Sequence, residues 1–231
     1  MRKDRNNYGK EANMKKVIEK IELEARKFFV GASGCHDWTH VERVRNLALR
    51  IAKKEKADLF VVEAAALLHD IGRKEEMASK GLFCHAERGG ILARKILKKY
   101  KLDNETIENI VHAIETHRFR KNLPPETLEA KVVFDADKLD SIGAVGIGRD
   151  FIFAGHSGSN SLYTGNEKKL AKSGKDYSFT KEDSPILEYE IKLKKIKNKI
   201  LTKEGMRIAK ERHDYMVGFF NRFEKEVRGL L

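Results

Sequence analysis

An apolar segment of the chain ends in two adjacent residues that can bind metal, His69 and Asp70. Nearly every residue from Phe60 to Leu68 is apolar, which is typical of a helix buried on all sides. A carboxylate at the carboxyl end of such a helix is destabilised by lost hydration and by the negative end of the helix dipole. The sequence therefore predicts a positive charge beside Asp70, which is either a metal ion bound by both side chains or a buried Arg or Lys partner.

Two other segments offer ligands of the same kind. His40 lies near the start of an amphipathic segment, Asp37 to about Lys54, at the edge of its apolar stripe. Asp137 belongs to a second acidic cluster, Asp135 to Asp140, and projects from the margin of the apolar face of an expected helix. Imidazole nitrogens and carboxylate oxygens in this combination suit Mn²⁺, Mg²⁺, Co²⁺, Ni²⁺, Fe or Zn²⁺, with open positions for water.

These residues stand in longer segments that resemble a known family. The order His40, His69-Asp70 and Asp137 resembles the signature of the HD-domain metal-dependent phosphohydrolases. Within that superfamily, the chain resembles small stand-alone bacterial and archaeal hydrolases, several of which are linked to nucleotide substrates. The matching segments are HDWTHVERV at 36–44, AAALLHDIG at 64–72, DADKLD at 135–140, GAVGIGR at 143–149, and the stretch from Ile186 to Phe220. The resemblance spans about Lys16 to Val227.

The resemblance implies an all-α, single-domain helical bundle of the HD type, in which His40, His69, Asp70 and Asp137 hold one divalent metal ion. It also implies a phosphohydrolase acting on a small phosphorylated substrate, with a nucleotide as the favoured choice. A metal ion in such a site lowers the pKa of a bound water and neutralises charge on phosphorus, so that in-line attack needs little beyond positioning. Hydrolysis of a phosphate ester and of a phosphoanhydride both remain open.

Two further histidines, His85 and His117, lie between the HD pair and the last aspartate. His117 falls on the same helical face as Ile110 and Ile114, so that we expect it to point inward. Because some HD proteins use extra histidines in this interval, the resemblance makes both residues candidates for lining the pocket. They either hold a second metal or hydrogen-bond the substrate phosphate or the attacking water. An ordinary buried histidine is the remaining interpretation.

Several cations stand beside the candidate ligands. Arg43 follows His40 by three residues and shares its helix face, and Lys138 directly follows Asp137. We predict that these two cations contact phosphate and that they form, with Asp70, the catalytic set. Further candidates for substrate contact are Arg73, Lys74 and Arg149. For each cation, an ion pair with a neighbouring carboxylate is the alternative. The candidates for a general base are Glu63 and Glu87.

The composition limits the class of protein. The 231 residues carry 47 Lys+Arg against 35 Asp+Glu, a formal net charge of +12, and 41% of them are hydrophobic. This composition excludes a disordered chain, and two cysteines cannot build a disulfide framework, so that we expect a cytoplasmic protein. No apolar run approaches the roughly 20 residues that cross a membrane. The positive charge suits an anionic substrate. It also leaves open a basic helical protein that binds nucleic acid or senses nucleotides through a non-catalytic HD site, although no helix-turn-helix signature supports nucleic acid as a partner.

The spacing of apolar residues predicts helices almost throughout. A basic segment, 1–15, precedes the HD-type domain, 16–231, whose metal-binding core covers about 36–150. A mobile loop rich in Gly, Ser, Lys and Asn is expected over about 155–183, followed by helices over about 185–228. The expected helices are 37–54, 60–68, 86–100, one capped by Asn104, one from Pro125 to about Ser141, 185–201 and 204–227.

Overall fold

All regular structure in the described part of the chain is helical, as predicted. A computed structural model describes residues 2–32, 36–79, 82–118, 123–156, 158–159, 161–175, 177, 180 and 182–231, with side chains from Ala12 onward. Within these residues no helix combines the length and apolar character needed to cross a bilayer. The α-helices are α1 (Arg2–Arg26), α2 (Trp38–Glu55), α3 (Leu59–Leu68), α4 (Arg73–Ala78), α5 (His85–Leu97), α6 (Asn104–Thr116), α7 (Leu128–Leu139), α8 (Gly143–His156), α9 (Glu167–Lys172), α10 (Pro185–Ile191) and α11 (Lys203–Val227), and the 3₁₀ helices include η1 (Lys27–Phe29) and η3 (Leu193–Lys199).

The helices fall into two compact units. The first unit runs from α1 through Ala136, and the second continues from Asp137 to the end of the chain, so that the boundary lies within α7. From Arg2 onward the predicted basic segment, 1–15, lies inside α1, and the predicted loop over 155–183 contains α9. The division of the chain into domains stays a prediction.

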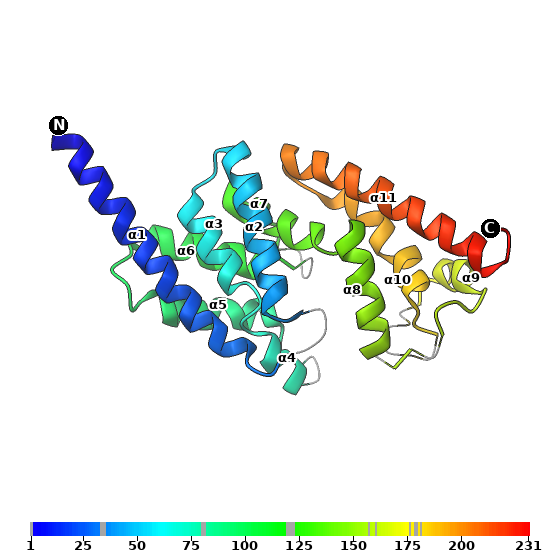
Figure 1. The fold of residues 1–231 in the computed structure, drawn as a ribbon. Coiled ribbons are helices and arrows are strands. Elements are labelled where there is room, and N and C mark those ends of the chain that lie inside the picture. The colour runs from blue at the N-terminus through cyan, green and yellow to red at the C-terminus, as the bar shows by residue number, and fades with distance from the viewer. Residues whose placement is uncertain are drawn as a thin grey trace. The chain divides into compact units, whose positions relative to one another are not determined.

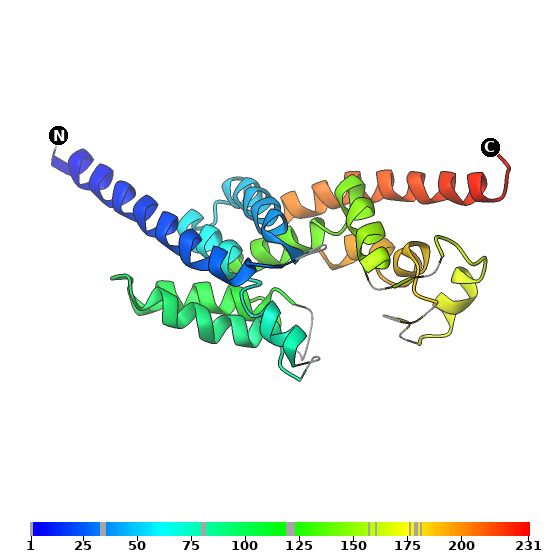
Figure 2. The same ribbon diagram turned by 60° about the horizontal axis from the view of Figure 1, so that its bottom comes forward.

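The core of the first unit is built around α3. Eight of its ten residues are buried, which confirms the central helix that a continuous apolar run predicts. Helix α3 packs against α1, α2 and α6, and α5 packs against α6 (Figure 1 and Figure 2). Helices α2 and α6 both pack on α3. Side chains at the start of α2 and at the ends of α3 and α6 can therefore lie close together.

Acidic side chains fix where two helices of this unit begin. Asp37 precedes α2 and accepts a hydrogen bond from the His40 N–H, so that His40 lies in the first turn. The prediction that Asn104 caps α6 is wrong by one residue. Asp103 accepts the capping hydrogen bond, and Asn104 is the first residue of the helix. A carboxylate caps as well as an amide and also gains from the positive end of the helix dipole.

The HD pair lies in the turn between α3 and α4. His69 is the C-cap of α3, Asp70 follows it, and α4 begins after Gly72. A Cβ atom on Gly72 would lie 2.3 Å from the carbonyl oxygen of His85 and 2.8 Å from the amide nitrogen of Gly89. Any larger residue would therefore push against backbone atoms of α5. Glycine at this position allows the first turn of α5, which carries His85, to approach the HD pair.

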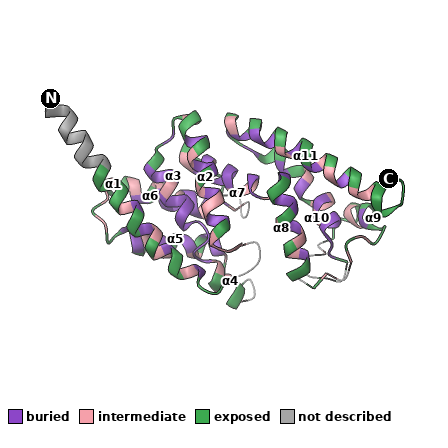
Figure 3. Cartoon of the chain, viewed as in Figure 1, coloured by how far each residue is buried: buried purple, intermediate pink, exposed green. Residues whose placement is uncertain are grey.

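In the second unit, α11 packs against α8 and η3, and α10 packs against α8 and α9 (Figure 1). Helix α11 carries both buried and exposed residues along its length (Figure 3), as expected of the predicted amphipathic helix over 204–227. The ring of Tyr189 in α10 stacks on the ring of Phe220 in α11, with centroids 4.2 Å apart. This aromatic pair joins the two helices through apolar contact.

The single helix predicted over 185–201 is wrong. Helix α10 ends at Ile191, and the 3₁₀ helix η3 follows from Leu193. Between them, Lys192 has φ −128° and ψ −57°, outside the helical region. A 3₁₀ helix repeats every three residues, which places Leu193 and Ile196 on one face, and both side chains are buried. The change of helix type keeps these apolar residues inside.

Candidate metal centre

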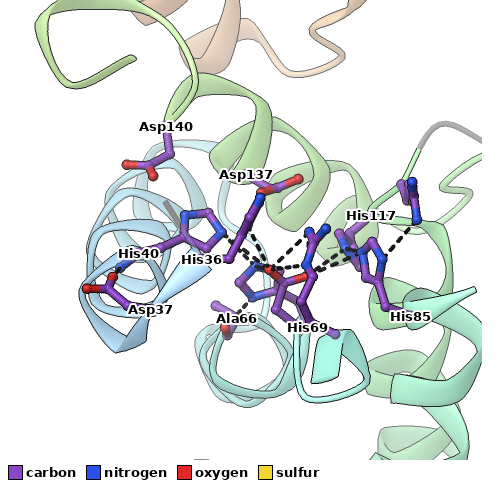
Figure 4. A network of polar contacts seen from close by, with 12 residues as sticks. His36, Asp37, His40, Ala66, His69, His85, His117, Asp137 and Asp140 are labelled. Carbon is purple, nitrogen blue, oxygen red and sulfur yellow. Dashed lines mark hydrogen bonds and ion pairs between the residues drawn. The ribbon is translucent and has the colours of Figure 1, made fainter. Parts of the chain in front are cut away.

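Five side chains converge in the interior of the first unit (Figure 4). They are His40, His69, Asp70, His85 and His117, and each is at most 2% exposed. They come from the first turn of α2, the turn after α3, the start of α5 and the C-cap of α6. The inward direction predicted for His117 is confirmed, and the HD pair is brought together with three histidines that are distant in sequence.

The carboxylate of Asp70 is the centre of this cluster. The imidazole nitrogens nearest to Oδ2 are His36 Nδ1 at 3.5 Å, His40 Nε2 at 3.7 Å and His69 Nε2 at 3.9 Å. Those nearest to Oδ1 are His85 Nε2 at 3.3 Å and His117 Nε2 at 3.6 Å. In the first unit, two groups of potential ligand atoms are each compact enough to hold one cation: His36, His40 and Asp70, and Asp70, His85 and His117.

Backbone carbonyl groups orient two of the imidazoles. His69 Nδ1 lies 2.8 Å from the carbonyl oxygen of Ala66, and His117 Nδ1 lies 2.6 Å from that of Ile114. A carbonyl oxygen only accepts, so that Nδ1 carries the proton and donates in both cases. When each ring is neutral, its Nε2 atom therefore presents a lone pair toward Asp70. This is the tautomer and orientation that a metal-ligating histidine usually has.

The nitrogen atoms of the cluster also face one another. The Nε2 atoms of His40 and His69 are 3.2 Å apart, and those of His85 and His117 are also 3.2 Å apart. His85 Nδ1 lies 2.7 Å from the Glu76 carboxylate, which accepts, and 2.9 Å from an Arg118 guanidinium nitrogen, which donates, so that the proton of His85 can lie on either ring nitrogen. Two facing lone pairs beside a carboxylate oxygen repel unless a proton or cation lies between them. The donor set therefore fits a divalent metal with nitrogen and oxygen ligands.

Arg73 supplies a positive charge to Asp70. Its Nε lies 3.2 Å from Oδ2 and its Nη2 lies 3.1 Å from Oδ1, so that it is the arginine partner that the sequence analysis allowed. Burial works to raise the pKa of Asp70, but the guanidinium and the neighbouring histidines outweigh it and hold that pKa well below its usual range. At neutral pH, Asp70 is therefore an ionised carboxylate.

Two histidines of the cluster stay neutral at physiological pH. Burial, with the positive charge of Arg73, lowers the pKa of His85 to about 3. Burial likewise lowers the pKa of His36 to about 4. Metal ions bind the neutral form of imidazole, so that these rings need not lose a proton before they bind one.

Three residues of the site escaped the sequence analysis: His36, Glu76 and Arg118. His36 is next to Asp70, as given above, and its position beside Asp37 in the HDWTH segment was the available signal. Glu76 orients His85, and Arg118 forms an ion pair with Glu76 and approaches His85 Nδ1 to 2.9 Å. These groups hold the imidazole of His85 in place.

The structure places the other predicted residues in pairs of their own. The observed partners are Thr39 for Arg43 at 3.0 Å, Asp137 for Lys138 at 2.6 Å, and Asp140 for Arg149 at 2.9 Å. Asp137, Lys138 and Arg149 belong to the second unit. Of the candidate bases, Glu63 forms an ion pair with Arg45, and Glu87 is exposed, as is Lys74. These pairs are compatible with both roles considered for the cations, which are contact with phosphate and ion pairing with a neighbouring carboxylate.

The helical fold and the His/Asp cluster define the class of protein. Residues 37–142 match the family model described as HD domain, and the cluster around Asp70 lies within this range. The chain belongs to the HD-domain family. The resemblance noted from the sequence is confirmed.

The relatives cover nearly the whole chain. The chain is 33% identical to the uncharacterized protein YpgQ of Bacillus subtilis over 219 residues, which are 93% of this chain and 96% of YpgQ. The crystal structure of Bacillus subtilis YpgQ in complex with ADP matches with a TM-score of 0.69 at 30% identity, covering 93% of this chain and 96% of that chain. An HD-superfamily hydrolase from Bacillus thuringiensis matches with a TM-score of 0.69 at 27% identity, covering 93% and 98% of the two chains.

Proposed function

We propose that this chain is a metal-dependent phosphohydrolase acting on a small phosphorylated substrate, and that the substrate is a nucleotide. The observation that carries the proposal is the set of imidazole Nε2 atoms that face one another, 3.2 Å apart in two pairs, around the buried carboxylate of Asp70. Such a set needs a proton or a cation between the facing nitrogens, and a divalent ion also suits the buried carboxylate. HD-superfamily hydrolases are among the relatives of the chain.

His40, His69, Asp70 and Asp137 are the proposed ligands of a divalent ion, which is Mn²⁺, Mg²⁺, Co²⁺, Ni²⁺, Fe²⁺ or Zn²⁺. The geometry around Asp70 supports the first three. Asp137 is proposed from the family signature, and it directly follows the fully buried Ala136 in α7, with its side chain 17% exposed. His85 and His117, with Asp70, form a second proposed set that either holds another ion or hydrogen-bonds the substrate.

The residues of the chain have distinct parts in the proposed reaction. Asp70 supplies an ionised carboxylate, and the carbonyl groups that accept from Nδ1 hold His69 and His117 in the ligating orientation. Arg73 contacts both oxygens of Asp70 and also forms an ion pair with Glu76, and its side chain is 23% exposed. It therefore brings a positive charge to the edge of the cluster, where a phosphate group can meet it. A divalent ion, when bound, lowers the pKa of water and offsets charge on phosphorus.

A nucleotide is the proposed substrate because a relative of this chain, YpgQ, has been crystallised in complex with a nucleotide. YpgQ was crystallised with ADP, and it aligns with this chain along nearly all of its length. Phosphate groups also suit a site that holds Arg73 and Arg118, since the planar guanidinium group binds phosphate oxygens in pairs. Arg43 and Lys138 are the proposed additional phosphate contacts.

The test is hydrolysis by protein that has been stripped of metal with a chelator and reloaded separately with Mn²⁺, Mg²⁺, Co²⁺ or Ni²⁺. Nucleoside mono-, di- and triphosphates serve as substrates, and the products are separated as nucleoside, phosphate or pyrophosphate. We expect hydrolysis only after reloading. Release of nucleoside identifies a phosphomonoesterase, whereas release of pyrophosphate or of a shorter nucleotide identifies cleavage of an anhydride.

Asp70→Asn is the decisive variant, because it keeps the shape of the side chain and removes its charge. We expect at least a hundredfold loss of activity with unchanged helical content by circular dichroism. Asp214→Asn is the matched control, since Asp214 lies on α11 with its side chain 56% exposed. Full activity of Asp70→Asn, or full activity of the stripped protein, contradicts the proposed function.

A further inference from the structure

The second unit contains a pocket that is separate from the histidine cluster. It is lined by the segment before α9, the first residues of α9, one face of α10 and the C-terminal part of α11. Ile186, Tyr189 and Phe220 give this lining an apolar part. Its charged and amide residues include Glu167, Lys168, Asn221, Glu224 and Arg228. A pocket with an apolar surface and a few fixed polar groups is the usual form of a small-molecule site.

Glu167 is the unusual residue of this pocket. This residue is only 1% exposed. One carboxylate oxygen, Oε1, accepts hydrogen bonds from the backbone N–H and the hydroxyl group of Thr164. The other oxygen, Oε2, is buried and has no hydrogen-bond partner in the described residues. A buried carboxylate oxygen almost always has a donor, so that its partner must come from outside the described protein groups.

The other carboxylates of the pocket have cations of their own. Glu224 lies 2.8 Å from Lys168 Nζ and 2.6 Å from an Arg228 guanidinium nitrogen. Glu190 forms an ion pair with Lys194. No ion pair involves Glu167 in the described part of the chain. Glu167 is therefore the carboxylate of this pocket whose second oxygen has no donor in the described residues.

We propose that this pocket binds a small organic cation, an ammonium or guanidinium group on a short apolar stem. The N–H groups of such a cation donate to the Oε2 atom of Glu167 and form a charge-assisted hydrogen bond with it. The stem lies against Ile186 and the aromatic pair of Tyr189 and Phe220, whose rings also favour a nearby cation.

The test uses two probes of the same shape, n-butylamine and n-butanol, on the full chain. The protein is dialysed against a chelator beforehand, so that the amine cannot bind through a metal at the histidine cluster. Binding is followed by the amide resonances of Glu167, Tyr189 and Asn221 in ¹H–¹⁵N correlation spectra. We expect saturable shifts at these residues with the amine and at least tenfold weaker binding of the alcohol. Equal binding of both probes, or shifts only elsewhere in the chain, overturns the proposal.

Glu167→Gln tests the carboxylate directly. The variant keeps an oxygen that can accept from Thr164 but removes the charge, so that we expect at least a tenfold weaker affinity for n-butylamine. Glu211→Gln is the matched control, because Glu211 lies on α11 with its side chain 78% exposed. Unchanged affinity in a folded Glu167→Gln protein overturns the proposal. If the variant loses its helical content, the comparison of the two probes on the unmodified chain decides.

Discussion

Replacing Asp150 with Asn should make the stability of the second unit less sensitive to alkaline pH. Asp150 lies on α8 and is 6% exposed, and its Oδ2 atom has no hydrogen-bond partner in the described residues. Burial, together with the negative charges of Glu188 and Asp183, raises the pKa of its carboxyl to about 9, against the opposing effect of Lys192. The folded protein therefore holds a proton at Asp150 that the unfolded chain releases.

The size of the effect follows from this difference in pKa. An unfolded aspartate has a pKa of 3.8, whereas folded Asp150 keeps its proton up to about pH 9. Its contribution to stability is fully present below pH 3.8 and is lost as the pH rises toward 9. Across this interval the free energy of unfolding falls by about 1.4 kcal/mol per pH unit. Between pH 6 and pH 8 the loss is therefore about 3 kcal/mol, and an asparagine at this position removes it.

Urea unfolding at pH 6 and pH 8 measures this difference. Helical circular dichroism is the required signal, because the single tryptophan, Trp38, lies in the first unit and Asp150 lies in the second. We expect the stability of Asp150→Asn relative to the natural protein to rise by about 3 kcal/mol between the two pH values. Asp214→Asn, at an exposed aspartate that is ionised in both states, should show no such rise. A difference that is the same at both pH values refutes the reasoning about Asp150.

Three further changes test the packing and charge of the first unit. Gly72→Ala should destabilise the protein by about 1–3 kcal/mol in urea unfolding, because its Cβ meets backbone atoms of α5. Gly148→Ala, whose Cβ meets nothing within 4 Å, should instead leave stability unchanged or raise it by up to about 1 kcal/mol. Asp103→Ala should cost about 1 kcal/mol by removing the cap of α6, whereas Asn104→Ala should cost little, and the reverse order would refute the assignment of the cap. Arg73→Gln should tighten binding of Mn²⁺ several-fold in calorimetry, since the guanidinium no longer competes for Asp70, and it should raise the KM for a phosphorylated substrate. Weaker Mn²⁺ binding by this variant would show that Arg73 supports the site rather than competing with the ion.

The parts of the fold that the sequence predicts correctly depend on local signals. The segment from Phe60 to Leu68 is apolar at every position but one, so that it is stable as a helix only when it is buried on nearly all sides. Helix α3 is accordingly the central helix of its unit. An aspartate is among the preferred N-cap residues of a helix, and Asp37 caps α2. The break between α10 and η3 was not predicted, because 3.6-residue and three-residue spacing of apolar side chains are nearly the same over one turn.

The parts of the site that the sequence does not predict depend on contacts between distant segments. Glu76 precedes His85 by nine residues and Arg118 by 42, and only the packing of α4, α5 and the end of α6 brings the three together. No composition or periodicity marks Glu76 among the other charged residues of its helix. His36 escaped for a different reason: its neighbour Asp37 explains the segment as a helix cap, and nothing local indicates that the imidazole reaches Asp70.

The arrangement around Asp70 explains why one arginine does not replace a metal ion there. Arg73 contacts both carboxylate oxygens, at 3.1 and 3.2 Å, and its single charge offsets the single charge of the carboxylate. The neutral ring of His117 presents its Nε2 lone pair on the inner side of the ring, because its Nδ1 donates to a backbone carbonyl. The Nε2 atom of His85 lies 3.2 Å from it, and two imidazole nitrogens at this distance need a proton or a metal ion between them. The charge of Asp70 can therefore be satisfied in two ways, whereas the facing imidazoles require a proton or a metal ion.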